Sequence, residues 1–145
     1  MVDRFKTITD VHVFLKNDND DILMLRRANT GYEDGNYSVI AGHLDGHEEV
    51  MEAAIREAKE EAGIEIRYMD IKVVGVMHRK QDDERISFFL SASRWSGDII
   101  NMEPERCDDL SWFPICDLPV NTIPYVRRAI ENWVNGLFFD SYGWR

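Results

Sequence analysis

Cysteine is scarce in this chain of 145 residues, and its scarcity restricts how the fold can be held together. The two cysteines, Cys107 and Cys116, are too few for the disulfide framework that many small secreted domains use. They are also not spaced as the close Cys-x-x-Cys pair of many zinc sites. We therefore expect both thiols to be reduced and to have a structural role.

Long apolar runs and a secretory leader are missing too. No stretch approaches the roughly 20 apolar residues that a membrane helix needs. Residues 1–6 lack the basic start and apolar core of a signal peptide, and neither end shows a lipidation motif. We expect a cytoplasmic protein with no membrane partner.

Positive charge is in deficit. Lysine and arginine total 17 against 27 aspartates and glutamates, which gives a formal net charge of −10. Affinity for long nucleic acids comes mainly from lysine and arginine that neutralise phosphates, so we expect no nucleic-acid partner. A small phosphorylated ligand remains compatible, because a bound divalent cation can reverse the local sign of charge. Acidic clusters are therefore the places to look for a site.

β-strand signals recur along most of the chain. The partly alternating residues 9–15 and the apolar run 22–25 predict a hairpin, with the polar residues 16–21 as its turn. A loop rich in turn-forming residues follows, and further strands are expected where β-branched and aromatic residues gather. The loop is expected at 28–36 and the further strands at 37–41, 64–78, 86–93 and 110–114.

Two segments have helical periodicity. Between residues 49 and 62 the apolar residues share one helical face, and Gly63 stands where a C-terminal cap belongs. Pro124 can begin a second helix, because the apolar residues after it, up to Trp133, repeat at helical spacing. No internal repeat or linker interrupts the pattern, so we expect one domain over residues 1–145, of the α/β class or α+β by some schemes.

The first helix carries a cluster of three glutamates. Glu57, Glu60 and Glu61 lie at i, i+3 and i+4, so their carboxylates emerge from one face of a helix. Like charges at this spacing repel, and carboxylate oxygens favour Mg²⁺, Mn²⁺ or Ca²⁺ as the compensating ion. Mg²⁺ usually binds through one or two carboxylates together with substrate phosphates. The cluster therefore predicts a Mg²⁺ site, with Mn²⁺ as a substitute, for a phosphorylated ligand.

The surroundings of the cluster fit this interpretation. Gly42, in the loop before the helix, lets the backbone approach a metal or a phosphate closely. Arg56 can pair with Glu52 or Glu60 on the helix, or with Glu48 across the loop, and we favour Glu48. The alternative is a solvated helix whose charges are paired four residues apart, but it does not explain why the loop, the arginine and the capping glycine occur together.

Residues 42–64 resemble the Nudix box, whose pattern is Gly, five residues, Glu, seven residues, Arg-Glu, an aliphatic residue, any residue, Glu-Glu, any residue, Gly and an aliphatic residue. The matching positions are Gly42, Glu48, Arg56, Glu57, Glu60, Glu61, Gly63 and Ile64. Ala58 departs from the pattern, since it is small where a bulky aliphatic residue is usual. The resemblance implies an α/β/α sandwich with a central mixed β-sheet.

Within the Nudix family the chain is similar to the MutT-like nucleoside triphosphate pyrophosphohydrolases, also at residues 29–32, 34–35 and 101–107. This similarity implies Mg²⁺-dependent hydrolysis of a phosphoanhydride bond in a small nucleotide, giving a nucleoside monophosphate and pyrophosphate. The box supports an ADP-ribose or nucleotide-sugar pyrophosphatase equally well. A non-catalytic nucleotide-sensing domain is a third alternative, but it predicts the loss of a box carboxylate.

The resemblance also implies a metal site. It assigns metal binding to Glu57, Glu60 and Glu61, together with the backbone carbonyl of Ala41. A further acidic ligand is expected from the loop near residues 103–105, where Glu103 and Glu105 are both available and can equally be plain loop charges.

The same resemblance implies roles in catalysis. It makes Glu57, Glu60 and Arg56 catalytic, with Glu57 the first choice of general base and Glu60 and Glu61 as alternatives. Glu48 is expected to hold Arg56 in place.

The substrate-binding candidates are two neighbouring arginines, Arg26 and Arg27, and the loop residues Gly42 and His43. Each arginine is alternatively a surface residue with its charge in solvent. We do not expect the histidine to bind metal, because Mg²⁺ takes nitrogen ligands poorly.

Aromatic residues can supply a platform for the base, although most aromatics at strand and helix spacing pack in a core. The candidates are Tyr32, Tyr37, Phe89, Trp112, Phe138, Phe139, Tyr142 and Trp144. The apolar tail 137–139 is a candidate homodimer patch, or else folds back on its own chain.

Overall fold

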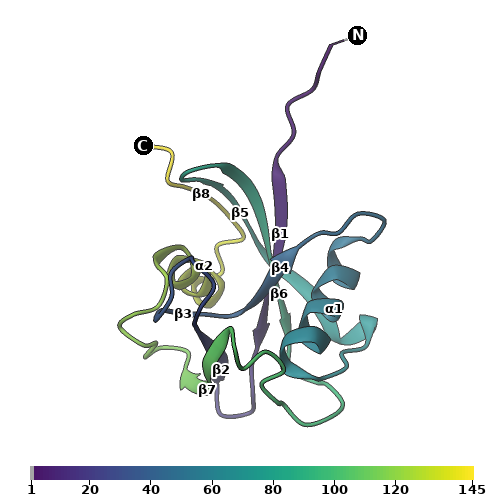
Figure 1. The fold of residues 1–145 in the computed structure, drawn as a ribbon, viewed down its shortest axis with the longest axis vertical. Helices are drawn as coiled ribbons and strands as arrows, with labels where there is room; N and C mark the ends of the chain where they lie inside the picture. Colours follow the sequence, from purple (N-terminus) through teal and green to yellow (C-terminus); the bar gives the residue numbers. More distant parts are fainter. Residues whose placement is uncertain (1) are drawn as a thin grey trace.

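The computed structural model describes residues 2–145 and shows a five-stranded mixed sheet between two helices (Figure 1). The sheet has the order β4-β1-β6-β5-β8, in which β1 pairs in parallel with β6 and β5 in parallel with β8. Its strands are β1 (Ile8–Leu15), β4 (Ile40–His43), β5 (Ile71–Lys80), β6 (Glu84–Ala92) and β8 (Phe139–Tyr142). The mixed α/β class and the central mixed sheet expected from the sequence are confirmed.

A second sheet of three strands lies at one end of the first. Its order is β3-β2-β7, and both pairings are antiparallel. The strands are β2 (Asp21–Arg27), β3 (Tyr37–Ser38) and β7 (Cys107–Pro114). The expected hairpin of residues 9–15 and 22–25 is therefore wrong, because β1 and β2 belong to different sheets and meet at a single bridge between Lys16 and Ile22. β1 pairs instead with β4 and β6, and its almost entirely buried side chains show that both faces of the sheet are covered there.

Three other expectations need correction. The strand expected at 37–41 is split between the two sheets as β3 and β4. The strand expected at 64–78 begins at Ile71, because residues 68–70 form a 3₁₀ turn and Glu65 bridges to Ser96. The tail contains an unpredicted strand, β8, whose apolar and polar residues are too few to give a period-2 signal.

The first helix, α1 (Val50–Ala62), packs on one face of the five-stranded sheet (Figure 1). Glu49 caps its N-terminus in a capping box with Glu52, and Gly63 ends it in the left-handed region at φ 70°. The face toward the sheet consists of small residues that are fully buried: Ala53, Ala54, Ala58 and Ala62. The small Ala58 is thus a packing feature of a helix that lies close to its sheet.

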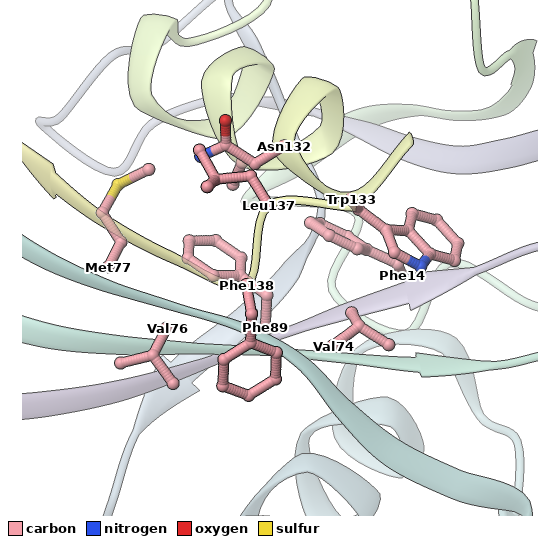
Figure 2. A pocket seen from close by; sticks show the side chains of 11 residues that line it. Phe14, Val74, Val76, Met77, Phe89, Asn132, Trp133, Leu137 and Phe138 are labelled. Atoms are coloured by element: carbon pink, nitrogen blue, oxygen red, sulfur yellow. The ribbon is translucent and has the colours of Figure 1, made fainter. Parts of the chain in front are cut away.

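The second helix, α2 (Pro124–Asn135), packs on the opposite face of the sheet (Figure 1). Trp133 of α2 stacks on Phe14 of β1 with ring centroids 5.2 Å apart, and Figure 2 shows the two rings beside each other. The tail after α2 folds back, and its strand β8 pairs with β5. Leu137, Phe138 and Phe139 nevertheless stay about half exposed, so the homodimer patch stays a prediction.

Neither helix within residues 2–145 has the length and apolar character needed to cross a membrane.

Candidate active site

A cleft of about 510 Å³ opens at the end of the sheet where β1 and β6 begin and β5 ends. It is bordered by strand residues, by α1, by the loop after β2 and by the loop before β7. Its lining includes Asp10, His12, Arg27, Tyr32, Ala41, Gly42, His43, Glu61, Arg79, Arg85, Asn101, Glu103, Arg106 and Tyr125. Two of its surfaces differ in charge, and we call them the acidic wall and the arginine wall.

The acidic wall consists of Ala41, Gly42, Glu57, Glu61 and Glu103. Gly42 on β4 lies against the carboxylate of Glu57, so closely that a Cβ at this position would overlap the carboxylate oxygens. Glu57 is 8% exposed and lies behind Glu61, which faces the cleft. The glycine of the motif is therefore needed for the space that it leaves to a buried glutamate.

Arg56 fixes the geometry of this wall. Its Nη1 donates to Glu57 Oε1 at 2.8 Å and to Glu60 Oε2 at 3.2 Å. Its Nε and Nη2 donate to the two carboxylate oxygens of Glu48 at 3.0 and 2.8 Å, and Nη2 also reaches the carbonyl of His43 at 3.1 Å. The hydrogen bonds that Arg56 donates to Glu48 are the largest cause of the raised pKa of Arg56. The arginine thus ties the loop before α1 to the glutamates on the helix.

Glu61 lies where negative charge accumulates. Burial raises its pKa well above the usual value, and Glu57 and Glu103 raise it further, while the backbone amide of Ala41 acts in the opposite direction. The donors available here are carboxylate and carbonyl oxygens, which suit a hard cation such as Mg²⁺. The residues therefore fit the divalent ion that the resemblance implies, with Glu57, Glu61, Glu103 and the carbonyl of Ala41 as the groups that would hold it.

The three glutamates of the motif are not equivalent. Glu60 is exposed and is held by Arg56, whereas Glu57 and Glu61 are close enough to interact directly. Across residues 2–145 no three acidic, histidine or cysteine side chains converge as a ready-made metal cage. A metal-binding or catalytic role of Glu60 stays a prediction. Of the two loop candidates, Glu103 lines the cleft and Glu105 is exposed elsewhere.

The arginine wall consists of Asp10, His12, Arg79, Arg85 and Tyr125. Arg79 is 5% exposed, and its guanidinium lies 3.6 Å above the ring of Tyr125. Arg79 Nη2 and Arg85 Nη1 donate to the same oxygen of Asp10, at 3.2 and 3.3 Å. These side chains form a buried polar network in which one carboxylate serves two guanidinium groups.

His12 lies fully within this network. Its Nε2 is 2.8 Å from the hydroxyl of Tyr125, and its Nδ1 is 3.5 Å from Asp10 Oδ1. Burial lowers the pKa of His12 to about 4, with Arg79 also lowering it and Asp10 opposing the shift. The imidazole is therefore neutral at pH 7. Burial likewise raises the pKa of Tyr125 above its usual value.

No sequence pattern indicated the arginine wall. Its members come from β1, β5, β6 and α2, and only strand register brings them together. Arg79 is directly opposite Arg85 in the β5–β6 pairing, and Asp10 is opposite Ser87 in the β1–β6 pairing. A single histidine or a single arginine in a sequence does not show that the residue belongs to a buried polar network.

The predicted substrate-binding residues separate into two groups. Arg27, Gly42 and His43 line the cleft, and Arg85 Nη1 is 2.9 Å from His43 Nε2. Arg26 points away from the cleft and pairs with Asp108 at 2.6 Å. The β2–β7 register shifts between Arg26 and Arg27, and of these two arginines Arg27 alone lines the cleft. Arg26 is therefore not placed to contact a substrate bound there.

The fold and the motif at its cleft agree with a family comparison. The model of the NUDIX domain family matches residues 6–134, which include the whole motif of residues 42–64. The chain therefore belongs to the Nudix family, as the resemblance of the motif indicated.

Curated relatives carry the name NAD-capped RNA hydrolase NudC. The protein of Vibrio atlanticus (strain LGP32) is 30% identical over 129 residues, which cover 86% of this chain and 45% of the relative. That of Pseudomonas entomophila (strain L48) is 31% identical over 100 residues, covering 69% of this chain and 34% of the relative. The chain spans less than half the length of these relatives.

Solved structures support the same fold. A MutT NUDIX hydrolase from Burkholderia pseudomallei superposes with a TM-score of 0.79 at 25% identity, covering 88% of this chain and 98% of that one. The MutT protein from Methanosarcina mazei Go1 gives a TM-score of 0.75 at 19% identity, covering 91% and 97%. The second likeness shows the fold alone.

Proposed function

We propose that this chain is a Mg²⁺-dependent hydrolase that cleaves a phosphoanhydride bond in a nucleoside triphosphate and releases a nucleoside monophosphate and pyrophosphate. The observation that carries the proposal is the interacting pair Glu57–Glu61 in the acidic wall. Glu61 of this pair lines a cleft of about 510 Å³, which is within the usual volume of a small-molecule site. Membership of the Nudix family and likeness to MutT structures support the same chemistry.

When bound, the ion neutralises phosphate oxygens and stabilises the charge that develops as water attacks phosphorus. Glu57 and Glu61 would hold it from α1, and Gly42 leaves the space that Glu57 occupies. Arg56 fixes the Glu57 carboxylate, which restricts its rotation. Glu57 remains our first choice of general base, with Glu60 and Glu61 as alternatives.

Substrate phosphates have cationic partners elsewhere in the cleft. Arg27, Arg85 and Arg106 all line it. His43 accepts from Arg85 through Nε2, since arginine can only donate, so its Nδ1 carries the proton and is available as a donor. Together these groups would bind the phosphates and orient the bond to be cleaved.

A second candidate function is hydrolysis of a nucleoside diphosphate linked to another group, such as ADP-ribose, a nucleotide sugar or a dinucleotide cap on RNA. The observation that favours it is the name of the curated relatives, NAD-capped RNA hydrolase. The same acidic wall serves this chemistry, because the diphosphate is the common reacting part. The expectation that nucleic acid is no partner, a cytoplasmic location and a homodimer stay predictions.

The proposal is tested by product analysis with Mg²⁺ across triphosphates, ADP-ribose, nucleotide sugars, NAD and NAD-capped RNA. Release of pyrophosphate and a monophosphate from a triphosphate, lost in Glu61→Gln, is the expected result. Glutamine keeps the shape of the side chain and removes its charge. Preferential cleavage of a diphosphate-linked substrate moves the function to the second candidate. If no compound in the panel is cleaved although nucleotides bind tightly, both candidate functions are contradicted and a sensing domain is favoured.

A further inference from the structure

Tyr32 is an exposed aromatic ring at the cleft. It lines the cleft from the loop between β2 and β3, and 48% of its surface is exposed. Within residues 2–145 its ring makes no contact with another aromatic ring. An exposed apolar ring beside a polar cleft is suited to cover a flat ligand group.

Other aromatic candidates are unavailable for stacking in this cleft. Tyr37 and Phe89 are buried in the core beside α2, and Trp112 packs at the core beside α1. Tyr125 does line the cleft, but it is 6% exposed and is covered by the guanidinium of Arg79. Tyr32 is therefore the cleft tyrosine that has an accessible ring.

The loop that carries Tyr32 is held by its own hydrogen bonds. The carboxylate of Asp34 accepts from the backbone amides of Thr30 and Gly31 and from the Thr30 hydroxyl. These bonds keep the pKa of Asp34 below its usual value. The loop also contains residues in the left-handed region, Asn29 at φ 56° and Gly31 at φ 84°. The backbone at Tyr32 is thus fixed by a local structure.

Arg27 supports the ring itself. Its Nε donates to the carbonyl of Tyr32 at 2.7 Å, and its Nη2 donates to the Thr30 hydroxyl at 3.1 Å. The guanidinium lies 5.3 Å from the centre of the Tyr32 ring, a cation–π distance. One face of the ring is therefore covered by Arg27, which leaves the other face for a ligand.

We propose that Tyr32 is the platform on which the nucleobase of the substrate stacks, with Arg27 as its positioning residue. The inference rests on the proposed function, since the acidic wall would hold the diphosphate while Tyr32, from a different element, receives the base. Stacking on an aromatic ring tolerates every base because each has a flat π-face. Tyr32 thus sets the requirement for a nucleoside, and discrimination among bases is left to other contacts.

The inference is tested by calorimetric binding of AMP, GMP, CMP and UMP to wild type, Tyr32→Ala and Tyr32→Phe. Ribose 5-phosphate, which lacks the base, is the matched ligand. Tyr68→Ala is the control variant, because Tyr68 is 54% exposed and lies outside the cleft. We expect Tyr32→Ala to weaken the binding of each monophosphate by about 5- to 100-fold, the range that corresponds to the loss of one base–aromatic stacking contact. Tyr32→Phe and Tyr68→Ala should stay within about threefold, because both keep the ring at position 32.

In turnover of a triphosphate, Tyr32→Ala should raise KM by a similar factor and leave kcat nearly unchanged. Ribose 5-phosphate binding should be the same in all variants. Three results would each contradict a stacking role of Tyr32. They are unchanged monophosphate binding in Tyr32→Ala, an equal weakening of ribose 5-phosphate binding in that variant, and no monophosphate binding by wild type. Failure of the proposed function is separate, because it appears as absent hydrolysis by wild type while monophosphate binding still reports on Tyr32.

Discussion

The acidic wall and the arginine wall face one cleft but are built in opposite ways. The acidic wall comes almost entirely from the 21 residues between Ala41 and Glu61, with Glu103 added from a loop. The arginine wall comes from three strands and a helix, and its Asp10 and Tyr125 are 115 residues apart (125 − 10). The first depends on local helix spacing, whereas the second depends on the register of the assembled sheet.

Their charge balance differs as well. In the arginine wall Asp10 pairs with Arg79 and Arg85, and Arg85 also pairs with Asp83, so the guanidinium groups have anionic partners within the protein. In the acidic wall Glu57, Glu61 and Glu103 concentrate negative charge beside one another, and Arg56 contacts the first of these. We infer that substitutions in the arginine wall lower mainly the free energy of unfolding and that substitutions in the acidic wall lower mainly turnover.

The largest effect is expected from Asp10→Asn. This change leaves Arg79, which is 5% exposed, without its anion, and removing one partner of a buried ion pair costs about 3–5 kcal/mol. Urea denaturation should show this loss in the free energy of unfolding. Asp20→Asn is the control: Asp20 pairs with Lys16 on the surface, where the change should stay within about 0.5 kcal/mol. Equal stability of Asp10→Asn and wild type would show that the network does not support the fold.

A pH-dependent loss of stability should follow from His12. Its pKa is about 4 in the folded protein against 6.5 for an exposed histidine, so the unfolded chain binds the proton first as the pH falls. The stability from neutral His12 is fully present above pH 6.5 and is lost between pH 6.5 and 4, by at most about 3 kcal/mol. Denaturation at a series of pH values measures it. His12→Gln should show a smaller slope across this window, and an unchanged slope would assign the loss to other groups.

In the acidic wall, Gly42→Ala should lower kcat by about 100-fold, because a displacement of about 1 Å at a catalytic group has effects of that size. The added Cβ would overlap the carboxylate of Glu57 and force it away. Gly75→Ala is the matched control, since its Cβ would meet neighbours at 3.6 Å or more, an ordinary contact. Steady-state kinetics compares the two. Normal turnover of Gly42→Ala would mean that the position of Glu57 is unimportant.

The smallest effect separates two neighbouring arginines. Arg27→Ala should raise KM about tenfold, because one charged hydrogen-bonding contact near a ligand contributes about 1.5–3 kcal/mol, part of which solvent replaces. Arg26→Ala should leave KM within about twofold, since Arg26 pairs with Asp108 outside the cleft. An equal rise of KM in both variants would contradict the placement of Arg26 outside the cleft.

The acidic wall was predictable from the sequence because its information is local. The spacing of Glu57, Glu60 and Glu61 fixes a helix face, and Gly63 ends the helix where expected. The spacing did not reveal that Glu60 turns outward to Arg56, because that choice depends on how the helix sits on β4. Nor did the spacing distinguish Glu103 from Glu105, because the conformation of their loop decides which of the two lines the cleft.

Most of the fold was predictable for the same reason. The prediction was wrong where pairing between distant strands determines which sheet a strand joins. The turn at residues 16–21 looks like a hairpin locally, but β1 pairs with β4 and β6 in another sheet. The short strand β8 exists because the edge of β5 is available to it. The members of the arginine wall could not be grouped without the register that places Arg79 opposite Arg85.

The most direct test of the central claim is turnover as a function of Mg²⁺ concentration in wild type, Glu61→Gln and Glu65→Gln. Glu65 is the control, because it is an exposed glutamate paired with Lys59 away from the cleft. The pair Glu57–Glu61 predicts cation-dependent turnover in wild type and Glu65→Gln, and a loss of about 100-fold or more in Glu61→Gln at any Mg²⁺ concentration. Turnover by Glu61→Gln with the rate and Mg²⁺ dependence of wild type would contradict the assignment of the metal to the acidic wall.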